Sequence, residues 1–66
     1  MPSTVIRWFH YLPDRRELLI GFQSGREYAY QDVPEAVHLA MRRAFSKGEF
    51  FNTHIRDHYS FVVRDK

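Results

Sequence analysis

The stretch Leu18–Tyr30, LLIGFQSGREYAY, constrains the fold more than any other part of the chain. Apolar side chains alternate on both sides of the short segment Gln23-Ser24-Gly25, which is the period of half-buried strands. Glycine in the third loop position suits a type I turn that is followed by a left-handed residue. The stretch therefore predicts a β-hairpin with a three-residue loop.

The length of this loop determines which side chains share a face of the hairpin. With three loop residues, Ile20 pairs with Tyr28 and Leu18 pairs with Tyr30. Both tyrosines then lie on one apolar inner face. A two-residue turn would shift the register by one residue and move them to the opposite face. We favour the longer loop because it leaves one apolar and one mixed face, and we therefore expect Tyr28 and Tyr30 in the core.

A first strand is predicted upstream of the hairpin. Residues 4–12, TVIRWFHYL, are rich in β-branched and aromatic types, and they follow a short unstructured lead, residues 1–3. The segment 13–16, PDRR, reads as a turn, because proline fixes φ and aspartate can bond its own backbone. These features predict a three-stranded antiparallel meander.

The first turn gives an independent check on the register. A four-residue loop pairs Tyr11 with Leu18 and Phe9 with Ile20, so Phe9 and Tyr11 join the inner face. This agrees with the register chosen for the second hairpin. Ile6 lies out of phase with Phe9 by one residue, which a bulge between them would explain.

The outer face of the predicted sheet is less polar than a solvated face. In this register it carries Trp8, His10, Leu12, Leu19 and Ala29. Trp8 lies opposite Gly21, so its ring either covers the glycine or belongs to a stacking or docking surface. We favour the first interpretation, because single exposed apolar residues are normal.

Two helices are predicted after the hairpin. Asp32 as N-cap, Pro34 in the first turn and Glu35 three residues after the cap predict a helix that runs to about Phe45. An apolar stripe at helical spacing indicates the buried side, and His38, Arg42 and Arg43 lie away from it. The stripe consists of Val37, Ala40, Met41 and Ala44.

The second helix follows almost at once, so the two helices form a corner. Ser46 as N-cap with Glu49 three residues on predicts a helix over about Lys47–His58. Its expected packing residues are Phe50, Phe51, Ile55 and Tyr59. The apolar segment 61–63 is either a short closing strand or an apolar tail, and the sequence leaves both open.

The expected fold class is α+β, with a three-stranded antiparallel meander followed by two helices that cover one face in a two-layer arrangement. The 66 residues suffice for a single domain, residues 1–66. With no cysteine, no disulfide can stabilise so small a core, whereas the aromatic content of 17% or a dimer can. The chain shows neither a signal segment nor a run of about 20 apolar residues. We therefore expect a cytoplasmic protein without membrane contact.

Four motifs, in order and at matching spacing, together resemble the KTSC domain family. This family is similar to a module at the C-terminus of some lysyl-tRNA synthetases, and it also occurs as small freestanding bacterial proteins. The resemblance implies an association with RNA through the synthetase context, and it brings no catalytic residues. The motifs are Ser3 with Ile6, the run Leu18–Tyr30 with its central Tyr28-Ala29-Tyr30, the pair Val33-Pro34, and Ser46 to Ile55 with Gly48, Phe50, Phe51 and Asn52.

The sequence offers no catalytic constellation. His54 and His58 have a spacing that can chelate a metal on a helix, but no third ligand stands out, and two solvated histidines are the simpler interpretation. A cysteine nucleophile, a glycine-rich phosphate loop and a nucleophile elbow are all missing from the sequence. We expect a protein that is not an enzyme and has no metal, no cofactor and no small-molecule substrate.

Basic residues make the stronger functional signal. The net charge is only +2, yet Arg42, Arg43 and Lys47 gather at the predicted helix corner, with Arg56 further along. Their position near the end of a helix is also favourable to the helix dipole without any ligand. Trp8 and Tyr59 are the candidate stacking rings.

Two functions from different classes remain. The first is a module associated with RNA, which contacts phosphates through these basic residues and stacks one or two bases. The second is a protein–protein interaction module, which would use the outer face around Trp8 and Leu19 or an edge strand to bind a second copy or a larger enzyme.

Overall fold

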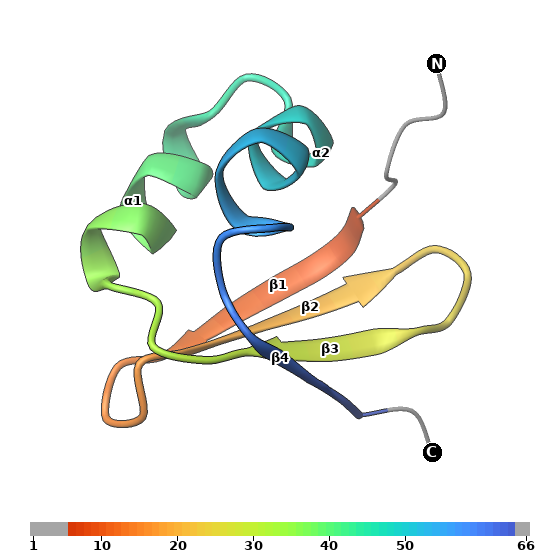
Figure 1. Ribbon diagram of the computed structural model, residues 1–66. Coiled ribbons are helices and arrows are strands. Elements are labelled where there is room, and N and C mark those ends of the chain that lie inside the picture. Colours follow the sequence, from red (N-terminus) through yellow and green to blue (C-terminus); the bar gives the residue numbers. More distant parts are fainter. Residues whose placement is uncertain (1–5, 65–66) are drawn as a thin grey trace.

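A computed structural model describes residues 6–64 as two layers, a sheet and a pair of helices that cover one of its faces (Figure 1). The expected fold class is confirmed. The described residues form an antiparallel sheet of order β1-β2-β3-β4. The strands are β1 (Ile6–Leu12), β2 (Glu17–Phe22), β3 (Glu27–Tyr30) and β4 (Phe61–Val63), and the helices are α1 (Glu35–Arg43), α2 (Lys47–Phe50) and the π-helical turn η1 (Phe51–Ile55). The predicted lead, residues 1–3, and the first two residues of the predicted first strand lie outside the described residues.

The β2–β3 hairpin has the predicted loop and register. Gly25 has a φ of 98°, the left-handed conformation that favours glycine. Its N–H donates to the carbonyl of Phe22, and the N–H of Phe22 donates to the carbonyl of Arg26, both at 2.9 Å. Leu18 then pairs with Tyr30, as expected.

The β1–β2 pairing is confirmed as well. Tyr11 pairs with Leu18 and Phe9 with Ile20, while the register shifts between Ile6 and Trp8. This shift is the bulge that the phase of Ile6 suggested. It lets Ile6 pack against the core although it is one residue out of step with Phe9.

The core lies between the inner face of the sheet and the helices. The sheet supplies Tyr11, Leu18, Ile20 and Tyr30, the segment before α1 supplies Val33, and the helices supply Met41, Phe51 and Ile55. Tyr30 is 2% exposed, while Tyr28 is half-buried and packs against this cluster. The hydroxyl of Tyr11 donates to the carbonyl of Val33 at 2.6 Å, so a polar group in the core has its partner.

The outer face is more closed than its composition suggests. The ring of Trp8 lies directly on Gly21, in the space that a Cβ would need. Leu19 and Ala29 are 9% and 2% exposed, although no helix within residues 6–64 covers this face (Figure 1). Beside Ala29, the side-chain amide of Gln31 donates to the Glu17 carboxylate and to the Ala29 carbonyl, both at 2.9 Å. The outer face therefore presents Trp8, the exposed Val62 opposite Ala29 and a polar network.

Helix α1 starts later than predicted, and Asp32 is not its N-cap. Asp32 adopts a left-handed conformation with φ of 57°, and Pro34 occupies the cap position without a side-chain hydrogen bond. The reason is tertiary, because the N–H of Val33 donates to the carbonyl of Arg16 at 2.8 Å. This bond ties the chain to the β1–β2 turn before it can become helical.

The predicted apolar stripe of α1 is confirmed only in part. Met41 is buried and Val37 half-buried, but Ala40 is exposed. His38, predicted to lie away from the stripe, is half-buried, and its ring stacks on Tyr11 with the centroids 4.8 Å apart. The helix ends at Arg43, two residues before the predicted end.

The second helix begins as predicted and ends early. The hydroxyl of Ser46 accepts a hydrogen bond from the N–H of Glu49 at 3.2 Å, which confirms the cap. The helix widens at Phe51, where the N–H of Arg56 donates to the Phe51 carbonyl five residues back, and it ends at Ile55 instead of His58.

The segment that the sequence left open is a strand. β4 pairs antiparallel with β3, with Phe61 opposite Tyr30 and Val63 opposite Tyr28. It forms one edge of the sheet, and β1 forms the other. No helix in the described part of the chain is long and apolar enough to cross a bilayer.

Candidate nucleic-acid interface

Lys47 holds the corner between α1 and α2. Its Nζ donates hydrogen bonds to the carbonyl oxygens of Arg42, at 3.0 Å, and Ala44, at 2.5 Å. Carbonyls at the end of a helix lack intrahelical donors, and the ammonium charge also suits the negative end of the helix dipole. The fold itself therefore accounts for Lys47.

Arg42 and Arg43 occupy the last turn of α1, and both are exposed. Within residues 6–64 no ion pair joins either guanidinium group to a carboxylate. The dipole explains part of their presence, as it does for Lys47. Their planar guanidinium groups nevertheless stay available to an anionic partner, and such groups can bind a phosphate through two parallel hydrogen bonds.

The other three residues proposed from sequence do not join this corner. Arg56 follows η1, about 13 Å along the helical path from Lys47 at 1.5 Å per residue, and its guanidinium lies 3.5 Å from the side-chain oxygen of Asn52. Tyr59 is half-buried against the core cluster. Trp8 lies on Gly21, on the face of the sheet opposite to that of the core residue Ile20. One flat contact surface cannot include all six residues.

Phe45 is the ring that sequence reasoning missed. It is 106% exposed, more than any other large apolar side chain described. It was overlooked because the predicted helix ran to Phe45, whereas the chain leaves α1 after Arg43 and enters α2 only after Ser46. The signal was present in the sequence, since a residue directly before an N-cap lies outside the helix.

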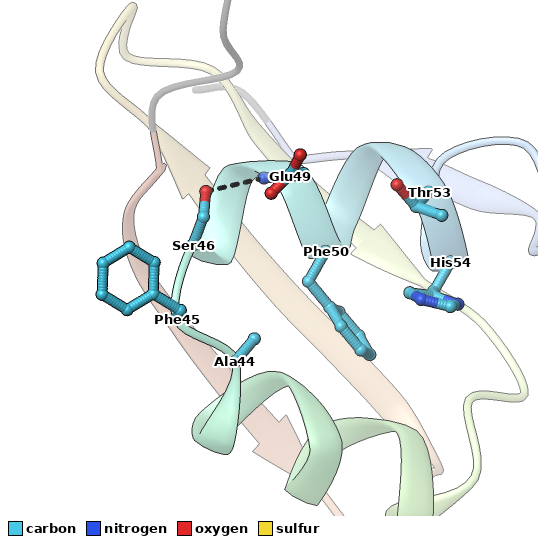
Figure 2. Close-up of a pocket in the computed structure, with 7 residues that line it drawn as sticks. All are labelled: Ala44, Phe45, Ser46, Glu49, Phe50, Thr53 and His54. Carbon is cyan, nitrogen blue, oxygen red and sulfur yellow. Dashed lines mark hydrogen bonds between the residues drawn. The ribbon is translucent and has the colours of Figure 1, made fainter.

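A surface pocket of about 300 Å³ opens beside Phe45. Phe50 and His54 form one wall, with their ring centroids 4.5 Å apart. Figure 2 shows the Phe50 ring pointing toward α1, while the Phe45 ring points away from it at the rim. The lining is completed by Ala44, Ser46, Glu49 and Thr53.

His38 lies under the basic corner as a packing residue. Its ring stacks on Tyr11 and meets the edge of Phe9 at 6.1 Å. Burial lowers the pKa of His38, and the nearby Arg42 guanidinium lowers it further. Its Nδ1 is buried and has no hydrogen-bond partner among the described residues, and the ring packs as an aromatic side chain.

His54 and His58, whose spacing could suit a metal ion, each contact another group of the protein. His54 packs on Phe50, and Nε2 of His58 lies 3.0 Å from the Thr53 carbonyl oxygen. Within residues 6–64 no three His, Cys, Asp or Glu side chains converge on a point where a metal ion could sit.

Comparison with known proteins places this fold in a family. The model of the KTSC domain matches residues 2–59, most of the chain. The chain belongs to the KTSC domain family. A crystal structure of a KTSC domain protein from Yersinia pestis superposes on this KTSC domain with a TM-score of 0.86 and 35% identity, covering 97% of this chain and 90% of that one.

A second relative is a far longer protein. This KTSC domain is 38% identical over 59 residues to a lysine–tRNA ligase of Nostoc punctiforme. The match covers 89% of this chain but only 10% of the ligase. The chain therefore corresponds to one small segment of that protein.

Proposed function

We propose that this KTSC domain is a non-catalytic binding module associated with RNA, and that it works in the cytoplasm. The observation that carries the proposal is its 38% identity to a segment of a lysine–tRNA ligase, a protein named for its action on tRNA. A segment that makes up 10% of such an enzyme has the size of an accessory domain. The binding of RNA is the simplest property that this domain and the similar segment of the ligase would share.

The helix corner supports this proposal physically. Arg42 and Arg43 project from the end of α1 without carboxylate partners among the described residues. Lys47 adds a third positive charge where its ammonium group holds the helix end. Phosphate contacts supply most of the affinity in sequence-tolerant nucleic-acid binding, and they release condensed counterions when they form.

Reversal of the two arginine charges tests the proposal. We expect Arg42→Glu/Arg43→Glu to weaken the binding of single-stranded RNA by about tenfold or more at low salt. The slope of log affinity against log salt should fall by about 1.4, since each phosphate contact on a single strand contributes about 0.7. Fluorescence anisotropy with a labelled oligonucleotide at several salt concentrations measures both quantities.

A control of equal charge separates a local effect from a change in net charge. Arg16 and Arg64 are exposed, and Arg16 lies in the β1–β2 turn near the start of α1. Arg16→Glu/Arg64→Glu should bind RNA nearly as well as the wild type. Equal losses in both double variants, or wild-type protein that binds no RNA at low salt, would contradict the proposal.

The edge of the sheet favours a second candidate, self-association. β4 exposes three successive large apolar side chains, Phe61, Val62 and Val63, at 47%, 56% and 48%. An exposed apolar edge strand presents unpaired backbone groups with which another strand can pair. The outer face contributes less than the sequence suggested, because Leu19 is buried.

A further inference from the structure

Phe45 leaves its ring in solvent instead of packing it against the core. Its ring is fully exposed in the short connection between α1 and α2. A single exposed apolar residue needs no explanation by itself. Phe45, however, follows Arg42 and Arg43 with only Ala44 between them and stands at the rim of a pocket, and this combination calls for a ligand.

The pocket has the size and lining of a small-molecule subsite. Its volume of about 300 Å³ lies at the lower end of the range for ligand pockets, about 300–1,000 Å³. One wall is the Phe50–His54 ring pair. The Ser46 hydroxyl already accepts a hydrogen bond from the N–H of Glu49, while Glu49 and Thr53, which are both exposed, supply further polar groups to the lining.

We propose that this pocket takes a nucleobase of single-stranded RNA, which stacks on Phe45 while Arg42 and Arg43 hold the neighbouring phosphates. The inference rests on the proposed function and assigns it a binding site. Aromatic platforms beside a cationic track are the usual arrangement for single strands, because every base has a π-face. An apolar protein partner would need the ring but not the two arginines, so the two exposed guanidinium groups that precede Phe45 in the chain favour RNA.

Glu49 gives the pocket a chemical preference. Its carboxylate only accepts hydrogen bonds, so it suits a base that offers an amino group at its edge, as cytosine does through N4. Uracil presents a carbonyl oxygen at that position, and two acceptors would face one another. The site therefore takes cytosine in preference to uracil.

The experiment compares three ligands and five proteins. The ligands are end-labelled single-stranded oligo(C), oligo(U) and an abasic ribose-phosphate oligomer, all of equal length. The proteins are the wild type and the variants Phe45→Ala, Phe45→Tyr and Glu49→Gln, and Leu39→Ala is added as a control. Leu39 is also an exposed apolar residue, at 42%, but it does not line the pocket.

We expect Phe45→Ala to weaken oligo(C) binding by about tenfold, the order of one lost base–aromatic stack, without a change in the salt slope. Binding of the abasic oligomer should not change, because only phosphates remain. Phe45→Tyr should restore affinity, and Glu49→Gln should reduce the preference for oligo(C) over oligo(U). Leu39→Ala should behave as the wild type.

Different failures point to different errors. If Phe45→Ala binds oligo(C) as the wild type does while the Arg42→Glu/Arg43→Glu variant does not, the base site is wrong and the RNA module stands. If the wild type binds none of the three ligands at low salt, both proposals fall. If Phe45→Ala instead abolishes a concentration-dependent dimer and leaves RNA affinity intact, the ring contacts a second copy, and the inference is overturned.

Discussion

Tyr30 shows what one side chain does in a core this small. Its ring contacts those of Phe51 and Phe61, with centroids 5.4 and 5.3 Å away, and so joins the helical layer to the last strand. Burial, together with the smaller effect of the neighbouring Tyr28, raises the pKa of Tyr30 to about 12. Arg56 acts in the opposite direction.

This shift predicts a loss of stability at high pH. The unfolded chain releases the Tyr30 proton near pH 10, whereas the folded protein keeps it to about pH 12. Since the folded state then binds more protons, the free energy of unfolding falls as the pH rises from about 10 to 12, by on the order of 2 kcal/mol. Urea unfolding across this range measures the loss.

The control for this prediction is Tyr30→Phe, which keeps the ring and removes the ionisable group. Other tyrosines titrate in the same range, so the informative quantity is the difference between the two proteins. The variant should lose clearly less stability than the wild type between pH 10 and 12. Parallel curves for the two proteins would show that Tyr30 is not the cause.

At the scale of elements, the second helix combines a strong start with an irregular end. Ser46 provides the cap, and the wide π turn over Phe51–Ile55 brings both of these side chains into the core. An isolated helix of this length has little stability, because most of the stability of a short helix in a protein comes from packing and capping. The cap therefore matters more here than in a long helix.

We predict that Ser46→Ala lowers the free energy of unfolding by about 1 kcal/mol, because the N–H of Glu49 loses its acceptor. Ser46→Asp should retain most of the stability, since aspartate is also a good N-cap. Ser24→Ala is the matched control, because Ser24 lies in the exposed hairpin loop and makes only a long 3.4 Å contact. Urea denaturation compares the midpoints, and equal midpoints for Ser46→Ala and Ser24→Ala would contradict the role of the cap.

At the scale of the whole molecule, the helices close one face of the sheet and leave two edges. Between β3 and β4, the backbone N–H of Gln31 donates to the Ser60 carbonyl at 2.8 Å, and the backbone N–H of Arg64 donates to the Glu27 carbonyl at 2.7 Å. Antiparallel bonds alternate along a strand, so the backbone groups of Phe61 and Val63 point away from β3. They are the groups that a second copy would use.

If β4 mediates self-association, Val63→Pro should abolish it and leave the fold intact. Proline removes one outward N–H, and edge strands tolerate it at such positions. Val62→Pro is the contrasting variant, because it removes an inward N–H of the β3–β4 ladder and should destabilise the sheet. Sedimentation equilibrium over a range of concentrations measures association. Wild-type protein that stays monomeric at the highest concentration would rule the dimer out.

The sequence by itself determined the strand register and the core of the sheet. Two loop lengths, of four and three residues, fixed independently which side chains share a face with Leu18 and Ile20, and a slip of one residue would have exposed them all. It also determined the Ser46 cap, because that interaction is local. Arg42, Arg43 and Lys47 meet at the corner for the same reason, since they are close in the chain.

Only the tertiary structure decided the features that depend on distant contacts. A bond to Arg16 displaced the start of α1 from Asp32, and Tyr11 drew His38 into the packed layer. β4 is a strand because the chain returns beside β3 after the second helix and pairs with it. No local sequence pattern predicts this return. Phe45 is exposed because α1 ends just before it, where the Lys47 ammonium group donates hydrogen bonds to the carbonyl oxygens of Arg42 and Ala44. Local patterns set the periodicity of each element, whereas packing between elements sets where each element ends and what it leaves in solvent.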